Sequence, residues 1–269
     1  MIRVAAFGDC HVGADSRGLL RGAMARVHEH ADVLLIAGDL TKCGTAAEAE
    51  VLAAELDALS VPAFAVLGNH DHHADEVEAV VSVMESAGVR VLEGDAVTVD
   101  VRSRRVGVAG VKGFGGGFPG ASGSEFGEAE MKAFMRHSKV VADRMHDALT
   151  SLTCDARIAL THYSPVEDTL RGERLEIYPF LGSYLLAEAI DRAGADLAIH
   201  GHAHAGSPQG TTPGGVAVRN VAQPVIRHAY QVFVLDHSGD TTAVTERAGG
   251  VHADDLTAGH ARRARGRFA

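Results

Sequence analysis

The feature that most constrains the fold of this chain is an alternation of short apolar runs with helical patterns in its first third. Strand-like runs at 2–9, 33–39 and 63–69 are each followed by an amphipathic stretch, and these stretches lie at 16–31, 46–59 and 75–88. Such an alternation predicts βαβ units with parallel strands. The runs are apolar on both faces, as expected for a sheet that is covered on both sides.

The rest of the chain predicts a second set of strands, at 89–94, 97–101, 105–111, 157–162, 196–201, 215–222 and 231–236. Helical patterns lie at 128–152 and 184–194, and a glycine-rich segment lies at 112–127. We therefore expect one domain over residues 1–247, with two sheets packed face to face and helices outside. Residues 248–269 are predicted to form a polar, mobile tail.

Composition narrows the classes of function. Hydrophobic residues make up 46% of the chain and charged residues 22%, which is typical of a globular protein. The net charge of -10 argues against a general attraction to nucleic acid or to a membrane surface, and the arginine cluster at 262–267 is weak evidence for a nucleic-acid contact. No apolar run approaches the roughly 18 residues that span a bilayer. Three cysteines without CxxC spacing, and an opening unlike a signal peptide, predict a cytoplasmic protein.

Side chains of metal-ligand type stand where five of the predicted strands end. They are Asp9 and His11, then Asp39, then Asn69 with His70 and Asp71, then His162, and finally His200, His202 and His204. Sites in α/β sheets gather at the carboxyl ends of strands, and carboxylates, amides and imidazoles bind divalent metals. Each residue alone has an ordinary explanation as a turn, a helix cap or a structural histidine. Their joint occurrence at five strand ends predicts a metal centre.

Spacing sorts these residues further. Asp9 and His11 are two residues apart, so in extended backbone both point to the same side. His202 and His204 have the same spacing. Alternation also turns His200 toward the side of His202, and we interpret His200 as a supporting residue. A glycine precedes four of the candidate ligands, where it allows the backbone to turn sharply and to approach an ion.

The order of these blocks, namely DxH, GD, GNHD, a single histidine and GHxH, resembles the calcineurin-like metallophosphoesterase superfamily. The resemblance implies an α/β fold of four layers, an αββα sandwich in which helices flank two mixed β-sheets. It also implies a pair of divalent metal ions, manganese or iron, with zinc as a variant. In that pattern the ligands are Asp9, His11 and His204 for the first ion, Asn69, His162 and His202 for the second, and Asp39 as a bridge between both.

The same resemblance implies a phosphoester hydrolase. A hydroxide shared by the metals would attack phosphorus, His70 would assist the departing oxygen, and Asp71 would hold His70 in orientation. The blocks GDLTKCG and THYSP are similar to those of cyclic-nucleotide phosphodiesterases and related bacterial enzymes. We therefore expect hydrolysis of phosphodiester bonds in cyclic nucleotides or other small diesters. A phosphomonoesterase acting on nucleotides or small metabolites is the alternative.

Two other classes fit the sequence less well. A non-catalytic scaffold on the same fold would be expected to lack some of the ligands or the histidine of GNHD, and here all of them match. A metal-dependent amidohydrolase would have its HxH pair early in the chain, whereas the pair here comes late.

Candidate substrate contacts lie beside these blocks. The arginines Arg171 and Arg174 would grip a phosphate, and Tyr163 would stack on a base. His72 follows GNHD directly. The alternatives are a solvated loop with paired charges for the arginines and an exposed position at a helix start for His72. The segment 113–120 is expected to be a lid or a plain loop, since its glycine spacing is a poor dinucleotide fingerprint. The expected partner is a small phosphate ester.

Overall fold

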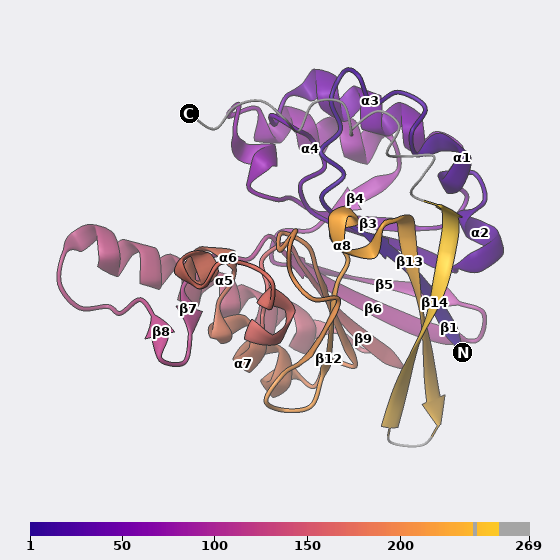
Figure 1. Cartoon of the computed structure of the whole chain (residues 1–269). Helices are drawn as coiled ribbons and strands as arrows, with labels where there is room; N and C mark the ends of the chain where they lie inside the picture. The colour runs from indigo at the N-terminus through magenta and orange to yellow at the C-terminus, as the bar shows by residue number, and fades with distance from the viewer. Residues whose placement is uncertain (239–240, 253–269) are drawn as a thin grey trace.

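The strands of this chain form two large sheets that pack face to face (Figure 1). The computed structural model describes residues 1–238 and 241–252. Within those residues, the first sheet has the order β14-β13-β1-β2-β3-β4. Its members are β1 (Ile2–Phe7), β2 (Val33–Ala37), β3 (Ala63–Val66), β4 (Val89–Val91), β13 (His228–Ser238) and β14 (Thr241–His252).

The second sheet of the described chain has the order β11-β12-β10-β9-β6-β5. Its members are β5 (Asp95–Val101), β6 (Arg104–Val111), β9 (Ala156–Thr161), β10 (Leu197–His200), β11 (Gln209–Thr211) and β12 (Ala217–Asn220). A separate small hairpin consists of β7 (Gly117–Phe118) and β8 (Ala121–Ser122).

Helices cover the outer face of each sheet (Figure 1). The first sheet is covered by α1 (Arg21–Met24), α2 (Val27–His30), α3 (Ala46–Leu56) and α4 (Val77–Ser86). The second is covered by α5 (Ala129–Ser151) and α7 (Tyr184–Ala193). Shorter helical elements are η1 (His70–His72), η2 (Glu167–Leu170), η3 (Leu175–Ile177), α6 (Tyr178–Leu181) and α8 (Gln223–Ile226). The architecture is the predicted four-layer αββα sandwich.

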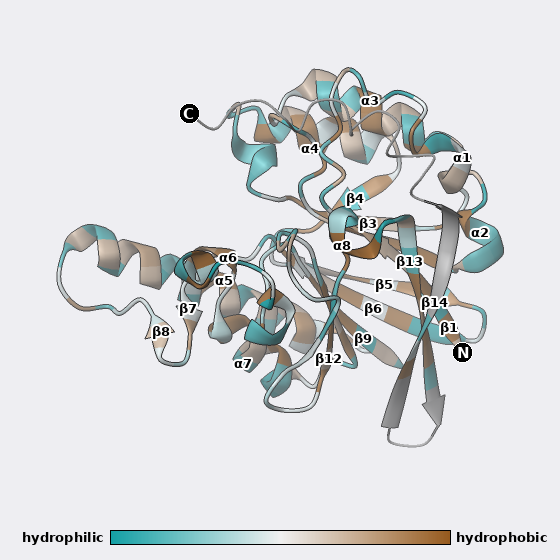
Figure 2. Cartoon of the chain, in the orientation of Figure 1, coloured by the Kyte–Doolittle hydropathy of each residue, from teal (hydrophilic) through white to brown (hydrophobic). Residues whose placement is uncertain are grey.

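Strand alternation produces these layers. In β1, Ala5 and Phe7 pack against the helices α1–α4, whereas Val4 and Ala6 join the apolar layer between the two sheets. The same rule holds in the second sheet, where neighbouring residues of β9 point alternately to the inter-sheet layer and to α5 and α7. Figure 2 shows hydrophobic residues along the central strands and polar residues on the outer surfaces of the helices.

The segment 16–31, predicted as one helix, forms the two short helices α1 and α2. The buried carboxylate of Glu55 explains where α1 begins, because it accepts hydrogen bonds from the amides of Gly18 at 2.6 Å, Leu20 at 2.8 Å and Arg21 at 2.9 Å. These amides are therefore not free to extend a helix toward residue 16.

The predicted boundary of the tail also differs from the structure. Strand β14 pairs with β13 and continues to His252, past the predicted boundary at residue 247. Residues 253–269, the remainder of the predicted tail, lie outside the described residues, and their mobility stays a prediction. Among the described helices, none combines the length and the apolar character that a membrane span requires.

Replacing Glu55 by Gln is expected to lower the free energy of unfolding by about 1–3 kcal/mol, because Gln keeps one acceptor oxygen but turns an NH₂ group toward at least one of the three backbone donors. Urea denaturation followed by circular dichroism measures this change. Asp57→Asn is the matched control, since the Asp57 side chain is 74% exposed in its ion pair with Arg21 and is expected to contribute about 0–1 kcal/mol. A loss in E55Q no larger than in the control would contradict the capping role.

Candidate metal centre

The candidate ligands lie at one edge of the sandwich, where parallel strands of both sheets end. In the first sheet β1, β2 and β3 run parallel, and in the second sheet β6, β9 and β10 run parallel. Side chains that follow these strands therefore meet at the same edge.

Two groups of potential ligand atoms form there, and Asp39 belongs to both. One group is Asp9, His11, Asp39 and His204, and the other is Asp39, His162 and His202. Within each group the ligand atoms lie within 4.8 Å of one another. Asn69 adjoins the second group, because its Oδ1 lies 3.0 Å from Nε2 of His162. The groups divide the residues in the way that the family resemblance implies, although their role as ligands stays a proposal.

The first group brings carboxylate and imidazole atoms to short range. His204 Nε2 lies 2.8 Å from Asp9 Oδ1 and 3.4 Å from His11 Nε2. His11 Nε2 in turn lies 3.7 Å from Asp39 Oδ2. Burial raises the pKa of Asp9, but the hydrogen bond with His204 and the charges of nearby histidines outweigh it and lower the pKa to about 2. Asp9 is therefore an ionised carboxylate at neutral pH.

Backbone carbonyls determine which nitrogen of three histidines faces the site. The pairs are His162 Nδ1 with Ala37 O at 2.9 Å, His202 Nε2 with Phe180 O at 3.3 Å, and His70 Nδ1 with Lys42 O at 2.8 Å. A carbonyl oxygen only accepts, so in each ring this nitrogen carries the proton. The other nitrogen of the neutral ring then presents a lone pair, which is the usual arrangement of a metal-binding histidine.

The surroundings of His162 show that a cation fits the second group. Its Nε2 lies 3.0 Å from Asn69 Oδ1 and 3.4 Å from Asp39 Oδ1. Because His162 Nδ1 donates to a carbonyl, its Nε2 is an acceptor, as are Asn69 Oδ1 and Asp39 Oδ1. A divalent cation between these three converging acceptors would satisfy all of them. Burial and the neighbouring His162 lower the pKa of His202 to about 3. Burial likewise lowers the pKa of His11 to about 4, so both rings are neutral ligand types at pH 7.

Four of the candidate ligands have a left-handed backbone. The φ angle is 58° at Asp9, 41° at His11, 49° at Asp39 and 69° at His202. Positive φ is uncommon outside glycine, and such strain persists mostly at functional sites. The prediction placed the DxH and HxH pairs in extended backbone. Left-handed residues at the strand ends direct these side chains into the site instead.

Two of the preceding glycines are required for close approach rather than for an unusual φ. A Cβ atom on Gly68 would overlap Asp39 Oδ1, and one on Gly201 would overlap Asp9 Oδ2. Gly38 differs, since its φ of 80° itself favours glycine. The glycines therefore let carboxylates of one loop pack against the backbone of the next.

The structure differs from the prediction that Asp71 orients His70. The buried Asp71 carboxylate accepts hydrogen bonds of 2.6–3.1 Å from the amides of Gly68, Leu40 and Thr41 and from the Thr41 hydroxyl. These bonds join the 68–71 turn to the loop after β2. The carbonyl of Lys42 holds the His70 ring, so Asp71 acts on His70 only through the position of the backbone.

His200 occupies a supporting position. Its ring is fully buried, Nδ1 lies 2.7 Å from Gly201 O, and Nε2 lies 2.8 Å from the hydroxyl of Thr169. Burial lowers the pKa of His200 to about 4, so the ring is neutral. It therefore ties η2 to the end of β10, beside the candidate ligands.

The residues predicted to contact substrate differ in their exposure. The Tyr163 side chain is buried, and its ring centre lies 4.4 Å from that of His202, which leaves little ring surface for stacking on a base. Arg171 is exposed, and its guanidinium pairs with the Asp168 carboxylate at 2.6 Å. This agrees with the charge-paired loop, which was the alternative to a phosphate contact. Arg174 is exposed at the start of η3, and His72 is exposed on η1.

The glycine-rich segment 113–120 is mostly a plain loop, one of the two predicted alternatives, and only two of its residues form a strand. Its residues Gly117 and Phe118 form β7, which pairs with β8. The amide of Gly116 donates to Pro179 O at 2.7 Å, and that of Gly117 donates to Gly182 O at 2.9 Å. The segment is therefore fixed against α6.

Lys112 is a residue at the site edge that the sequence analysis missed. It follows β6 directly, as the candidate ligands follow their strands. Its ammonium lies 5.6 Å from the ring centre of Phe114 and 5.8 Å from that of Tyr163. Burial lowers the pKa of Lys112, against the opposing effect of Glu93 and Asp39. The signal was present in the sequence, because Lys112 directly follows the predicted strand 105–111.

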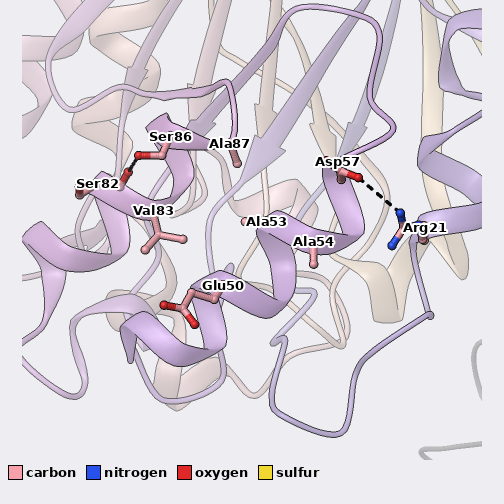
Figure 3. Close-up of a pocket in the computed structure, with 9 residues that line it drawn as sticks. All are labelled: Arg21, Glu50, Ala53, Ala54, Asp57, Ser82, Val83, Ser86 and Ala87. Carbon is pink, nitrogen blue, oxygen red and sulfur yellow. Dashed lines mark hydrogen bonds and ion pairs between the residues drawn. The ribbon is translucent and has the colours of Figure 1, made fainter.

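A cavity of about 490 Å³ lies elsewhere, between α3 and α4 (Figure 3). Its lining includes the ion pair of Arg21 and Asp57, together with Ala53 and other small side chains. None of the candidate metal ligands belongs to this lining. The chemistry of the chain is therefore to be sought at the edge of the sheets.

Comparison with protein families identifies the family of this chain. Residues 2–206 match the model of the calcineurin-like phosphoesterases. This chain belongs to that family. The matched range contains all the candidate ligands, and the family consists of metal-dependent phosphoester hydrolases. Comparison with curated proteins gives no match.

Several solved structures resemble the chain in fold over most of its length. The phosphopantetheinyl hydrolase of Mycobacterium tuberculosis has a TM-score of 0.59 and 15% identity, over 81% of this chain and 88% of that one. A protein of Thermus thermophilus has a TM-score of 0.55 and 18% identity, over 91% and 98%. A putative 5'-nucleotidase from Staphylococcus aureus has a TM-score of 0.59 and 15% identity, over 93% of this chain and 53% of that one. At these identities the likeness concerns the fold.

Replacing Gly201 by Ala is expected to weaken metal binding by about 10–100-fold, because the added Cβ would displace the Asp9 carboxylate. Metal titration of the apoprotein, followed by elemental analysis of metal per chain, measures the effect. Gly22→Ala is the matched control, since a Cβ there meets nothing within 4 Å. Metal binding in G201A equal to that of G22A would show that the close approach at Gly201 does not control the site.

Proposed function

We propose that this chain is a dinuclear metal-dependent phosphoesterase that hydrolyses phosphodiester bonds in small substrates. The observation that supports it most is the membership of Asp39 in both groups of ligand atoms. A carboxylate offers two oxygens and a negative charge, which suits a bridge between two cations. The preference for diesters rests on the blocks GDLTKCG and THYSP and their resemblance to cyclic-nucleotide phosphodiesterases.

Each group would hold one ion. Asp9, His11 and His204 would bind the first, Asn69, His162 and His202 the second, and Asp39 both. Two divalent ions supply positive charge for the phosphate oxygens and a nucleophile at neutral pH. Manganese or iron is the expected choice, with zinc as a variant. A cytoplasmic location stays a prediction from the sequence.

His70 would serve the departing oxygen in this proposal. Its side chain is 44% exposed, which leaves it accessible to substrate. Its Nδ1–H donates to the carbonyl of Lys42, and Nε2 lies 4.0 Å from Asp39 Oδ2. In the protonated ring, Nε2–H is the free donor. Transfer of this proton to the leaving alkoxide is general acid catalysis.

A phosphomonoesterase is the second candidate, and Lys112 is the observation that favours it. This cation at the site edge suits a phosphate group with two negative charges. Assays of a diester, a monoester and cyclic nucleotides, each with Mn, Fe, Zn or Mg, separate the two activities. A metal-loaded protein that hydrolyses none of these esters would instead support the non-catalytic scaffold.

Replacing His70 by Ala is expected to leave metal content unchanged and to slow hydrolysis of an alkyl diester by about 10²–10⁴-fold, the usual contribution of general acid catalysis. The loss should be smaller for a nitrophenyl diester, because nitrophenolate departs without a proton. His73→Ala is the control, since His73 is exposed and follows η1. Equal losses of rate for both esters would show that His70 does not act by donating a proton.

Replacing Asp39 by Ala is expected to reduce binding of both ions, because Asp39 lies in both groups. His202→Ala is the matched variant, since His202 lies in one group and should chiefly affect one ion. Metal per chain after equilibration with limiting Mn²⁺ measures the difference. Full occupancy of both positions in D39A would contradict the bridging role.

A further inference from the structure

Lys112 places a positive charge beside the second group of candidate ligands. The residues that follow β9, His162 and Tyr163, both donate their backbone N–H to Lys112 O, at 2.9 and 3.1 Å. The Lys112 ammonium lies 5.8 Å from the Tyr163 ring centre, and that ring lies 4.4 Å from the ring of His202. The charge therefore stands within the wall of the site.

Two aromatic rings lie near this ammonium, with the ring centre of Phe114 5.6 Å away and that of Tyr163 5.8 Å away. The two ring centres are 6.0 Å from each other, so the rings lie side by side. Glu93, an acidic neighbour, uses Oε2 to accept the backbone N–H of Lys112 at 3.0 Å. Within residues 1–238 and 241–252, no carboxylate forms an ion pair with the Lys112 ammonium.

This environment is costly for the protein alone and favourable for an anion. A half-buried cation without a carboxylate partner loses hydration that its neighbours only partly replace. The rings meanwhile restrict the flexible side chain, so little further ordering is needed when an anion arrives. Phe114 is itself held by His137 of α5, whose ring centre lies 4.6 Å away, and by Phe134, at 5.1 Å. The ring of Phe114 beside the cation is thus fixed in position by packing.

We propose that Lys112 forms an anion subsite that binds a second negative charge of the substrate, either on the scissile phosphate or on a group next to it. The inference rests on the proposed function and specifies its substrate class. The site would favour a phosphate ester with two negative charges close together. Such substrates are diesters that carry a further phosphate or carboxylate group on one arm, and monoesters in their doubly charged form. A singly charged diester with neutral arms would leave Lys112 without a partner.

Binding of two simple anions to the metal-loaded protein tests the subsite directly. Isothermal calorimetry with inorganic phosphate, which is largely doubly charged at pH 8, is compared with dimethyl phosphate, which is singly charged. In Lys112→Met, phosphate affinity is expected to fall by about tenfold or more, the contribution of one charge-assisted hydrogen bond. Affinity for dimethyl phosphate should fall by less than about threefold.

Two further variants serve as controls. Lys112→Arg keeps the charge and is expected to keep phosphate affinity within about threefold of the wild type. Lys139→Met removes an equal charge from an exposed position of α5 and should change neither affinity. Melting temperature and metal per chain are measured for each variant. If K112M is poorly folded, Lys112→Gln repeats the comparison, because it also removes the charge and keeps a polar side chain, and the same outcomes apply to it.

The outcomes separate this inference from the proposed function. Phosphate affinity in K112M within twofold of the wild type, equal losses for both anions, or no phosphate binding by the wild type would each overturn the subsite. In turnover, K112M should raise KM for 4-nitrophenyl phosphate more than for bis(4-nitrophenyl) phosphate, with smaller changes in kcat. A wild type that binds phosphate through Lys112 but hydrolyses neither ester would refute the proposed function and leave the subsite standing.

Discussion

The hydrogen bond between His162 and the carbonyl of Ala37 is the contact on which the candidate site depends, because it joins the two sheets. His162 follows β9 of the second sheet, and Ala37 ends β2 of the first. The apolar layer between the sheets provides cohesion but little direction. This directional bond fixes the sheets relative to each other at the point where Asp39 must meet His162 and His202. A small sliding of one sheet would separate the two halves of the site.

The layers and the gathering of ligand types were predictable, because both follow from local rules. Alternation decides which face of a strand is buried, and parallel strands bring their carboxyl ends to one edge. Lys112 also follows a parallel strand and could be placed at this edge by the same rule. It was not among the predicted site residues, because lysine is not a metal-ligand type. The four-layer sandwich was predicted correctly for the same local reasons, as the packing of β1 on both faces illustrates.

What could not be predicted depends on contacts between distant segments. The pattern of 16–31 is helical in itself, yet Glu55 of a later helix binds its amides. The Asp71 carboxylate stands beside His70 in sequence, yet the loop after β2 uses it. Tyr163 has the aromatic ring that stacking on a base requires, yet this ring is packed against His202. In each case a contact with a residue distant in sequence decides the conformation of the segment or the direction of the side chain.

The strained strand ends stabilise one another. The amide of Asp9 donates to Gly38 O at 2.9 Å, and that of His11 donates to Asp39 O at 3.0 Å. Left-handed backbone costs about 1–2 kcal/mol per residue, so the loops after β1 and β2 hold this shape as a pair rather than singly. A substitution in either loop is therefore expected to displace the candidate ligands on the other loop.

The distances along the chain between site residues have a consequence for folding. Asp9 and His204 are 195 residues apart, and Ala37 and His162 are 125 apart. Contacts of such high sequence separation require large loops to close and form late in folding. The pairs β1–β2 and β2–β3 join residues only 29 positions apart, so this unit and the helices can form earlier. Metal affinity would then arise only once both sheets have docked, which makes metal capture a signal that folding of the sandwich is complete.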